Sequence, residues 1–264
     1  MADPGTETAG TMTTEALPDP LEEAERLIRA GDAAGVPLRA TGGVGVALIC
    51  PSAQRPPLAR TYQDIDFVAR AKDAKVIVRF MVEQGYVPEE EFNVLHGQRR
   101  LFFLDQKHKR EADIFLDAIE MCHRLDLRER AWILDRTLAP ADLLLSKLQV
   151  VDTNEKDYKD AMAVLADHEL TADDTGISIN RLNELCASDW GWWRTVTMVA
   201  EQTHKVALGV AQEHPQAGLD HVPDRARHVV AELQRAPKSR RWKMRARVGD
   251  RVRWHADPED IDHD

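Results

Sequence analysis

The sequence has few cysteines and no long hydrophobic run. Three cysteines stand far apart in 264 residues, and none belongs to a CxxC pair or to a Cys/His spacing typical of zinc sites. We therefore expect reduced thiols, with no disulfide framework and no zinc ribbon, as in a cytoplasmic protein. The absence of about 18 consecutive apolar residues excludes a membrane-spanning helix, and residues 1–20 lack the cationic and apolar segments of a signal peptide.

Positive charge is scarce as well. The chain carries 35 Lys and Arg against 45 Asp and Glu, which gives a formal net charge of -10. Proteins that coat nucleic acid non-specifically are normally basic, so any contact with nucleic acid must be made by a local patch. Hydrophobic residues make up 43% of the chain, which is enough for a sizeable core in one domain or two.

The hydrophobic pattern predicts an α+β fold in two parts. Up to about residue 170, runs with strand alternation mix with helical periodicity, whereas later residues are mainly helical in pattern. The first part should hold a small mixed or antiparallel sheet with flanking helices. The predicted segments are a disordered tail (1–19), a mixed domain (20–170), a mainly helical domain (171–255) and an acidic tail (256–264).

Individual elements follow from periodicity and from end signals. Asp19 and Asn154 precede helical runs and are predicted N-caps. Helices are predicted over residues 21–35, 44–50, 72–86, 138–152, 154–170, 177–214 and 224–235. Strands are predicted over residues 37–41, 60–69, 91–96, 99–105 and 111–117.

The stretch RTYQDIDFVA, residues 60–69, places Asp64 and Asp66 two positions apart in an apolar run. In a strand such residues share a face, so the two carboxylates repel each other unless a cation lies between them. Asp113 in EADIFLD follows on a nearby predicted strand, with Asp117 as a second choice. Three carboxylates without nearby His or Cys favour Mg²⁺ or Mn²⁺ over zinc. Incidental acids at an exposed strand end are the alternative.

A glycine turn, TGGVG at residues 41–45, precedes these acids by about 20 residues. Such a turn between a strand and a helix can bring backbone N–H groups up to a phosphate. The ordered set GGVGVALI, RTYQDIDF, EADIF, DLLLSKL and KDYKD resembles the nucleotidyltransferase superfamily typified by DNA polymerase beta. It is most similar to the branch that holds the AbiEii and MenT toxins of toxin–antitoxin systems. The resemblance covers roughly residues 38–165.

The resemblance implies a role for each matching residue. Gly42 and Gly43 would cradle the triphosphate, and Lys147 would reach it. Asp64, Asp66 and Asp113 would be the metal ligands, with Asp113 also orienting or deprotonating the acceptor hydroxyl, and Asp157 and Asp160 would complete the nucleotide site. Many members carry Ser where this chain has Val44. From the residues alone, Lys147 could also be a surface lysine, and a solvated helix face explains Asp157 and Asp160 equally well.

The implied activity is metal-dependent transfer of a nucleotidyl group from an NTP to an acceptor hydroxyl, with release of pyrophosphate. The toxin resemblance implies the 3′ end of tRNA as the acceptor and a cognate antitoxin as a partner. A small-molecule or protein hydroxyl is the alternative acceptor, and transfer of a γ-phosphoryl group is also open. A degenerate nucleotide- or RNA-binding module without turnover is the alternative from another class.

The C-terminal stretch RWKMRARVGDRVRW, residues 241–254, alternates cationic and apolar residues. Strict alternation around Gly249 and Asp250 predicts a two-stranded ribbon with one arginine-rich face. From Arg225 to Arg253 there are 11 Lys and Arg against two acids. Arg245, Arg247 and Arg251 are therefore candidate RNA-phosphate contacts. Pairing of this face with the acidic tail is the alternative.

Overall fold

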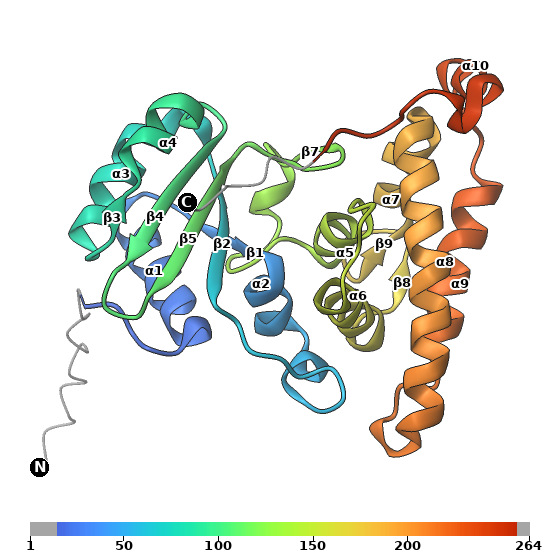
Figure 1. The fold of residues 1–264 in the computed structure, drawn as a ribbon, viewed down its shortest axis with the longest axis horizontal. Coiled ribbons are helices and arrows are strands. Elements are labelled where there is room, and N and C mark those ends of the chain that lie inside the picture. Colours follow the sequence, from blue (N-terminus) through green and yellow to red (C-terminus); the bar gives the residue numbers. More distant parts are fainter. Residues whose placement is uncertain (1–14, 258–264) are drawn as a thin grey trace, which may run out of the picture.

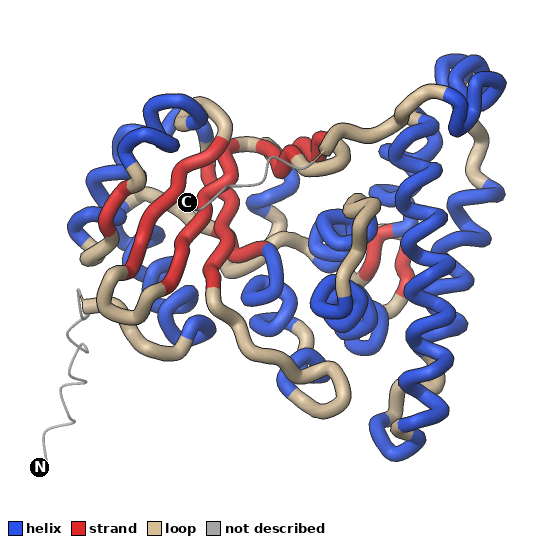
Figure 2. The backbone as a smooth tube through the Cα atoms, in the orientation of Figure 1, coloured by secondary structure: helices blue, strands red, loops and turns tan. Residues whose placement is uncertain are grey.

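The computed structural model describes residues 15–257, and its fold is a mixed α+β fold with a helical C-terminal half (Figures 1 and 2). A five-stranded mixed sheet has the order β1-β2-β5-β4-β3, in which β2 and β5 run parallel and the other neighbours run antiparallel. The predicted fold class is therefore confirmed. The strands are β1 (Arg39–Thr41), β2 (Asp64–Ala69), β3 (Val87–Pro88), β4 (Arg100–Asp105) and β5 (Arg110–Leu116).

Ten helices occur in residues 15–257, and both predicted N-caps are confirmed. The carboxylate of Asp19 accepts from the N–H groups of Leu21 and Glu22, and Asn154 forms a reciprocal capping box with Asp157. The first six helices are α1 (Pro20–Ala34), α2 (Gly42–Ile49), α3 (Ala74–Glu83), α4 (Glu90–His96), α5 (Pro140–Leu148) and α6 (Glu155–Asp167). The others are α7 (Ile179–Ser188), α8 (Trp190–Glu213), α9 (Val222–Arg235) and α10 (Arg240–Val248).

The two faces of the central sheet have different coverings. Ile65, Phe67 and Ala69 alternate with the acids of β2 and enter an apolar core formed with α1 and α3. In Figure 1 these two helices lie on the side of the sheet away from the helical half. The opposite face of β2 carries Asp64 and Asp66, so the alternation that buries the apolar residues also directs both carboxylates toward the rest of the chain.

The helical half packs around α5 and α6. Apolar residues of these two helices share one core with α7, α8 and α9, and in Figure 1 they lie between the sheet and the long helix α8. The domain boundary expected near residue 170 falls between α6 and α7, inside this shared core. Two short ribbons complete the fold, β6 (Ala118–Glu120) with β7 (Arg124–Asp126) and β8 (Leu170–Thr171) with β9 (Ile177–Ser178).

The strand predicted over residues 91–96 is wrong, because these residues form helix α4. Acidic residues occupy the first turn of this helix, and the ring of Phe92 packs 4.7 Å from that of His96, one turn later. The side chain of Asn93 accepts from the N–H of Phe102 and donates to its carbonyl, at 2.7 and 3.0 Å. One amide side chain thus pairs with the backbone of β4 where a neighbouring strand was expected.

The ribbon predicted over residues 241–254 is also wrong, because most of this stretch forms helix α10. Its alternation also fits a helix, since the partly buried Trp242, Arg245, Ala246 and Gly249 are spaced at three and four residues. Ser239 caps the helix by accepting from the N–H of Trp242, and Gly249 ends it with a positive φ. The regular structure therefore ends at Gly249, as predicted, but the residues before it form a helix and not a strand.

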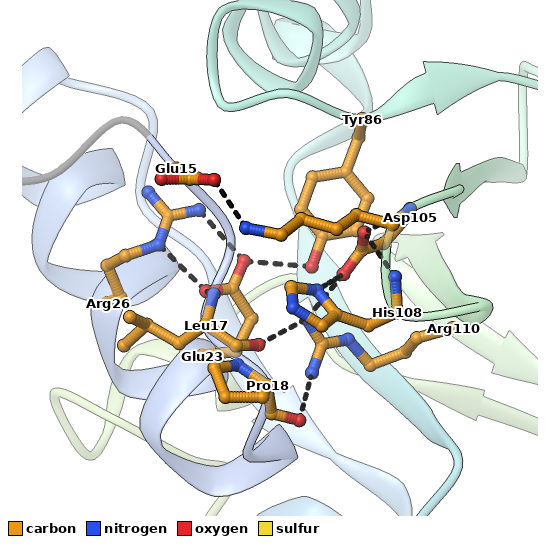
Figure 3. A network of polar contacts seen from close by, with 10 residues as sticks. Glu15, Leu17, Pro18, Glu23, Arg26, Tyr86, Asp105, His108 and Arg110 are labelled. Atoms are coloured by element: carbon orange, nitrogen blue, oxygen red, sulfur yellow. Dashed lines mark hydrogen bonds and ion pairs between the residues drawn. The ribbon is translucent and has the colours of Figure 1, made fainter.

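The first described residues are fixed to the sheet by a buried polar network (Figure 3). Glu23, fully buried on α1, accepts from Arg26 at 2.7 and 2.8 Å, from the Tyr86 hydroxyl at 2.9 Å and from the N–H of Leu17 at 2.9 Å. Arg110 on β5 donates to the Leu17 carbonyl at 2.8 Å and to Asp105 at 2.7 Å. The tail expected over residues 1–19 is described only from Glu15, and its earlier part and residues 258–264 of the acidic tail lie outside the described residues.

The sequence excluded a membrane span and a disulfide framework, and two findings bear on these points. None of the described helices is both long enough and apolar enough to cross a membrane. All three cysteines, Cys50, Cys122 and Cys186, are buried free thiols.

Glu23→Ala should lower the free energy of unfolding by about 3–5 kcal/mol, because it removes the buried carboxylate that pairs with the guanidinium of Arg26 and accepts from the Tyr86 hydroxyl. Glu22→Ala is the matched control, since Glu22 is exposed one residue earlier on the same helix, and it should change the value by less than about 1 kcal/mol. Urea titration monitored by circular dichroism measures both variants. Equal effects would show that the network in Figure 3 does not stabilise the fold.

Candidate active site

A row of neighbouring residues crosses four strands of the central sheet, and three of its four side chains are polar. Strand register places Thr41 of β1 beside Asp66 of β2, Asp66 beside Asp113 of β5, and Asp113 beside Phe102 of β4. Neighbours across a sheet point to the same face. Asp66 and Asp113, which are 47 positions apart in the sequence, therefore share one surface.

This row forms one wall of a cavity of about 250 Å³. The opposite wall comes from α5 and α6, through Ser146, Lys147 and Asp157. Six of the eight residues that the resemblance assigned to the site line this cavity: Gly42, Asp64, Asp66, Asp113, Lys147 and Asp157. The remaining polar wall consists of Thr41, Arg100 and Glu111, and apolar side chains of Phe102, Phe115, Ile119, Met121 and Val150 close the rest.

The carboxylates repel one another in this enclosure. Burial, followed by the charges of Asp64 and Asp113, raises the pKa of Asp66 to about 7. Burial also raises the pKa of Asp113, although Arg100 acts in the opposite direction. The protein therefore holds anions together at a position where a cation would relieve their repulsion.

Lys147 is the cation on the opposite wall, and it is not a solvated surface lysine. Its ammonium lies 2.9 Å from Asp160 and 3.3 Å from Asp157, and only 12% of its side chain is exposed. Burial alone would lower the pKa of Lys147, but the two carboxylates outweigh burial and raise it. Lys147 therefore stays charged at the edge of the cavity.

Asp160 is buried behind Lys147 and does not belong to a solvated helix face. It accepts from Arg60 at 3.0 and 2.9 Å and from Lys147, and its side chain is 2% exposed. Burial alone would raise the pKa of Asp160, but the two cations lower it overall. The guanidinium of Arg60 also lies 4.4 Å from the ring centre of Tyr62. Asp160 thus fixes two cations rather than facing the cavity.

Both glycines of the turn allow side chains of the chain itself to approach closely. Gly42 has a φ of 59°, and a Cβ at this position would overlap the carboxylate of Asp66. A Cβ on Gly43 would overlap the guanidinium of Arg60 and contact Tyr62. Gly42 therefore lets Asp66 lie at the N-terminus of α2, whereas Gly43 faces the Arg60 side and does not line the cavity.

The donors in the cavity fit a hard divalent cation only in part. Within residues 15–257, Asp64 and Asp66 make no ion pair, and the hydroxyl of Thr41 is buried without a hydrogen-bond partner. Asp113, in contrast, is paired with Arg100 through both carboxylate oxygens. Across the same residues, no three His, Cys, Asp or Glu side chains form a group that could hold a metal. Oxygen chemistry favours Mg²⁺ or Mn²⁺ at Asp64 and Asp66, while Asp113 is already neutralised.

The remaining candidates lie elsewhere. Asp117 follows the end of β5 with a positive φ, and its carboxylate accepts from the N–H of Ala71 outside the cavity. Arg245, Arg247 and Arg251 lie on or just after α10, at the far end of the helical half in Figure 1. Sequence reasoning missed Arg100 and Thr41 as cavity residues. Strand register places both in the cavity: Arg100 belongs to no local motif, and Thr41, although it opens the TGGVG turn, carried no predicted role of its own.

Comparisons of the chain with protein-family models, with characterised proteins and with solved structures find no match. The resemblance to the nucleotidyltransferases therefore stays a prediction from the motifs.

Asp66→Asn should raise Tm more at pH 8 than at pH 5 in metal-free protein. The pKa of Asp66 is about 7 in the folded protein and near 3.8 in the unfolded chain. The Asp66 carboxyl therefore lowers the stability of the fold progressively as pH rises from about 4 to 7. Asn carries no charge at any pH and removes this penalty. Asp220→Asn is the control, because Asp220 is exposed and should change Tm little at either pH. Thermal unfolding in EDTA measures both, and an equal gain at the two pH values would contradict the crowding of carboxylates.

Proposed function

We propose that this protein is a nucleotidyltransferase, which transfers a nucleotidyl group from an NTP to an acceptor hydroxyl and releases pyrophosphate. The observation that supports this best is the meeting of Asp64, Asp66 and Asp113 with Lys147 around one cavity. A group of carboxylates opposite a charged lysine suits a substrate that combines phosphates with a metal ion.

Asp64 and Asp66 would hold Mg²⁺ or Mn²⁺, with the Thr41 hydroxyl close to the same wall. Such ions, when bound, activate an attacking hydroxyl and stabilise the leaving pyrophosphate. Asp66 contributes through its position against Gly42, which holds its carboxylate at the N-terminus of α2. Both residues are fixed by the strand register and need no rearrangement.

Lys147 and the N-terminus of α2 would bind the triphosphate. The ammonium is held by Asp157 and Asp160 at 3.3 and 2.9 Å, so its direction is set before substrate arrives. Asp113 would orient the acceptor hydroxyl and accept its proton, since a carboxylate with a raised pKa is a stronger base. The acceptor and the triphosphate would thus meet between the two walls.

A binding module without turnover is the second candidate, and the pairing of Asp113 with Arg100 favours it. In that arrangement a nucleotide would bind at Lys147, but no free carboxylate would serve the acceptor. Val44 in place of Ser points in the same direction, because its apolar side chain is buried and offers no hydroxyl.

The wild-type protein should transfer label from [α-³²P]NTP, but not from [γ-³²P]NTP, to total tRNA in the presence of Mg²⁺. EDTA should abolish the transfer. Asp66→Asn should lower it at least about a hundredfold, because even the groups that only support metal ligands typically matter 10–100-fold. Gel autoradiography with ATP, GTP, CTP and UTP compared side by side identifies the donor.

The other outcomes separate the alternatives. Transfer of γ-label alone would indicate phosphoryl transfer, and binding of NTP without transfer would indicate the module without turnover. Transfer of label to a small molecule or a protein in a cell extract, with none to tRNA, would indicate that the acceptor is not RNA. Near-normal turnover in Asp66→Asn would overturn the assignment of the site.

We propose RNA, ending in a tRNA-like 3′ hydroxyl, as the acceptor because of helix α10. The exposed cations on or next to this helix make no ion pair within residues 15–257: Arg240, Arg241, Lys243, Arg247 and Arg251. Arg245, in contrast, donates to the carbonyls of Gly249 and Val252, both at 2.7 Å, and serves the helix end. Because α10 lies far from the sheet in Figure 1, an acceptor that reaches both must be long, as RNA is. By resemblance, the protein would act as a toxin with a cognate antitoxin.

Replacing Lys243, Arg247 and Arg251 together by Gln should raise KM for tRNA on the order of tenfold and leave KM for NTP unchanged, because phosphate contacts are lost far from the cavity. Replacing Lys72, Lys75 and Arg79 by Gln is the control, since these exposed cations lie on or just before α3 on the other side of the sheet. Transfer rates are measured at low and high salt. Equal effects of the two triple variants would refute a specific RNA surface on α10.

A further inference from the structure

Arg100 forms an ion pair with Asp113, one of the three proposed metal ligands, and so lies where a metal ion would contact that carboxylate. Register pairs Arg100 of β4 with Phe115 and pairs Phe102 with Asp113, so Arg100 is the diagonal neighbour of Asp113 on the cavity face. Its Nε lies 2.8 Å from each carboxylate oxygen, and its Nη2 also contacts Asp113. The side chain of Asp113 is 8% exposed and that of Arg100 is 22% exposed, so the carboxylate is largely removed from water.

Two aromatic rings also lie near the guanidinium of Arg100. It lies 5.0 Å from the ring centre of Phe115 and 5.7 Å from that of Phe92. Arg100 is therefore positioned by α4, β4 and β5 together. A guanidinium keeps its charge at any ordinary pH, so deprotonation cannot release Asp113.

Lys147, the other cation that lines the cavity, pairs with carboxylates outside the set of proposed metal ligands. Lys147 neutralises Asp157 and Asp160 on the opposite wall, whereas Asp64 and Asp66 carry no ion pair within residues 15–257. Of the three proposed ligands, Asp113 is thus neutralised, whereas Asp64 and Asp66 are not. This asymmetry separates the three acids that the sequence pattern treats alike.

We propose that Arg100 is a positioning residue that holds Asp113 and competes with a divalent cation for its carboxylate; this inference rests on the proposed function. In the free protein a first cation binds at Asp64 and Asp66 alone. Asp113 becomes available, as a ligand or as a base for the acceptor, only when the guanidinium leaves it. Arg100 engages both carboxylate oxygens, so a divalent cation at Asp113 would meet the guanidinium charge at close range and is expected to displace it.

Manganese binding to the full chain without nucleotide tests this competition. Free Mn²⁺ is measured by electron paramagnetic resonance for wild type, Arg100→Gln, Asp113→Asn and the double variant. Arg100→Gln should tighten Mn²⁺ binding on the order of tenfold when Asp113 is present. In the Asp113→Asn background the same change should alter the affinity less than about threefold, because Arg100 acts through Asp113.

Two controls keep the result specific. Arg99→Gln removes the same charge one residue earlier, where Arg99 pairs with Glu120 at 3.1 Å, and should leave Mn²⁺ affinity within about twofold. If circular dichroism shows that Arg100→Gln is unfolded, Arg100→Lys replaces it in the same cycle, since lysine keeps the charge but loses the two-pronged contact. Whichever of the two Arg100 variants is used should tighten Mn²⁺ binding only when Asp113 is present.

Equal tightening with and without Asp113 would overturn the inference, because Arg100 would then act only by long-range charge. No tightening at all would overturn it too. The proposed function fails separately if wild-type Mn²⁺ binding is absent or persists unchanged in Asp66→Asn. Binding that depends on Asp66 but not on Arg100 overturns the inference alone.

Discussion

The parallel pairing of β2 with β5 is the constraint on which the candidate site depends. It sets Asp66 beside Asp113 and Asp64 beside Glu111, so acids from two distant segments face one cavity. A shift of one residue in either strand would direct its carboxylates into the apolar core under α1 and α3. The same alternation that buries Ile65 and Phe67 therefore fixes the anions, and the acidic face follows from the packing of the opposite one.

Crowded carboxylates oppose folding, and the structure compensates them unevenly. Charged side chains form a connected chain in which each cation contacts at least one carboxylate; Asp160 is buried and Lys147, Asp157 and Arg60 are half-buried. Arg100 neutralises Asp113 in the same way. Buried pairs of this kind roughly offset their own desolvation and add little net stability. These pairs fix the direction of the charged groups. Among the residues that the structure describes, Asp64 and Asp66 form no ion pair, and a substrate cation would act there.

Local signals in the sequence predicted much of the fold, and failed where a contact across the chain decided the structure. Strand alternation and helix caps located β2, β5, α1 and α6, because each signal lies within the element that it specifies. Helix α4 has local support in its acidic first turn, and Asn93 fixes it to the backbone of β4 through a contact that no local pattern encodes. The apolar residues of α10 fit both the two-residue period of a strand and the spacing of three and four residues of a helix. The partly buried Trp242 and Ala246 follow the helical spacing. The sequence also did not predict that Arg100 lies at the site or that Asp160 is buried. The first depends on strand register and the second on helix packing.

Helix α5 joins the two halves of the molecule at the site. Leu143, Leu144, Leu145 and Leu148 enter the core of the helical half, while Ser146 and Lys147 on the same helix line the cavity beside the sheet. The position of the Lys147 ammonium relative to Asp66 is therefore set by the packing of α5 against α6, α7 and α8. The helical half accordingly does more than carry α10, because its core determines the distance between the cationic and anionic walls. Substitutions in that core should act on the site through geometry, without any change in the residues that line it.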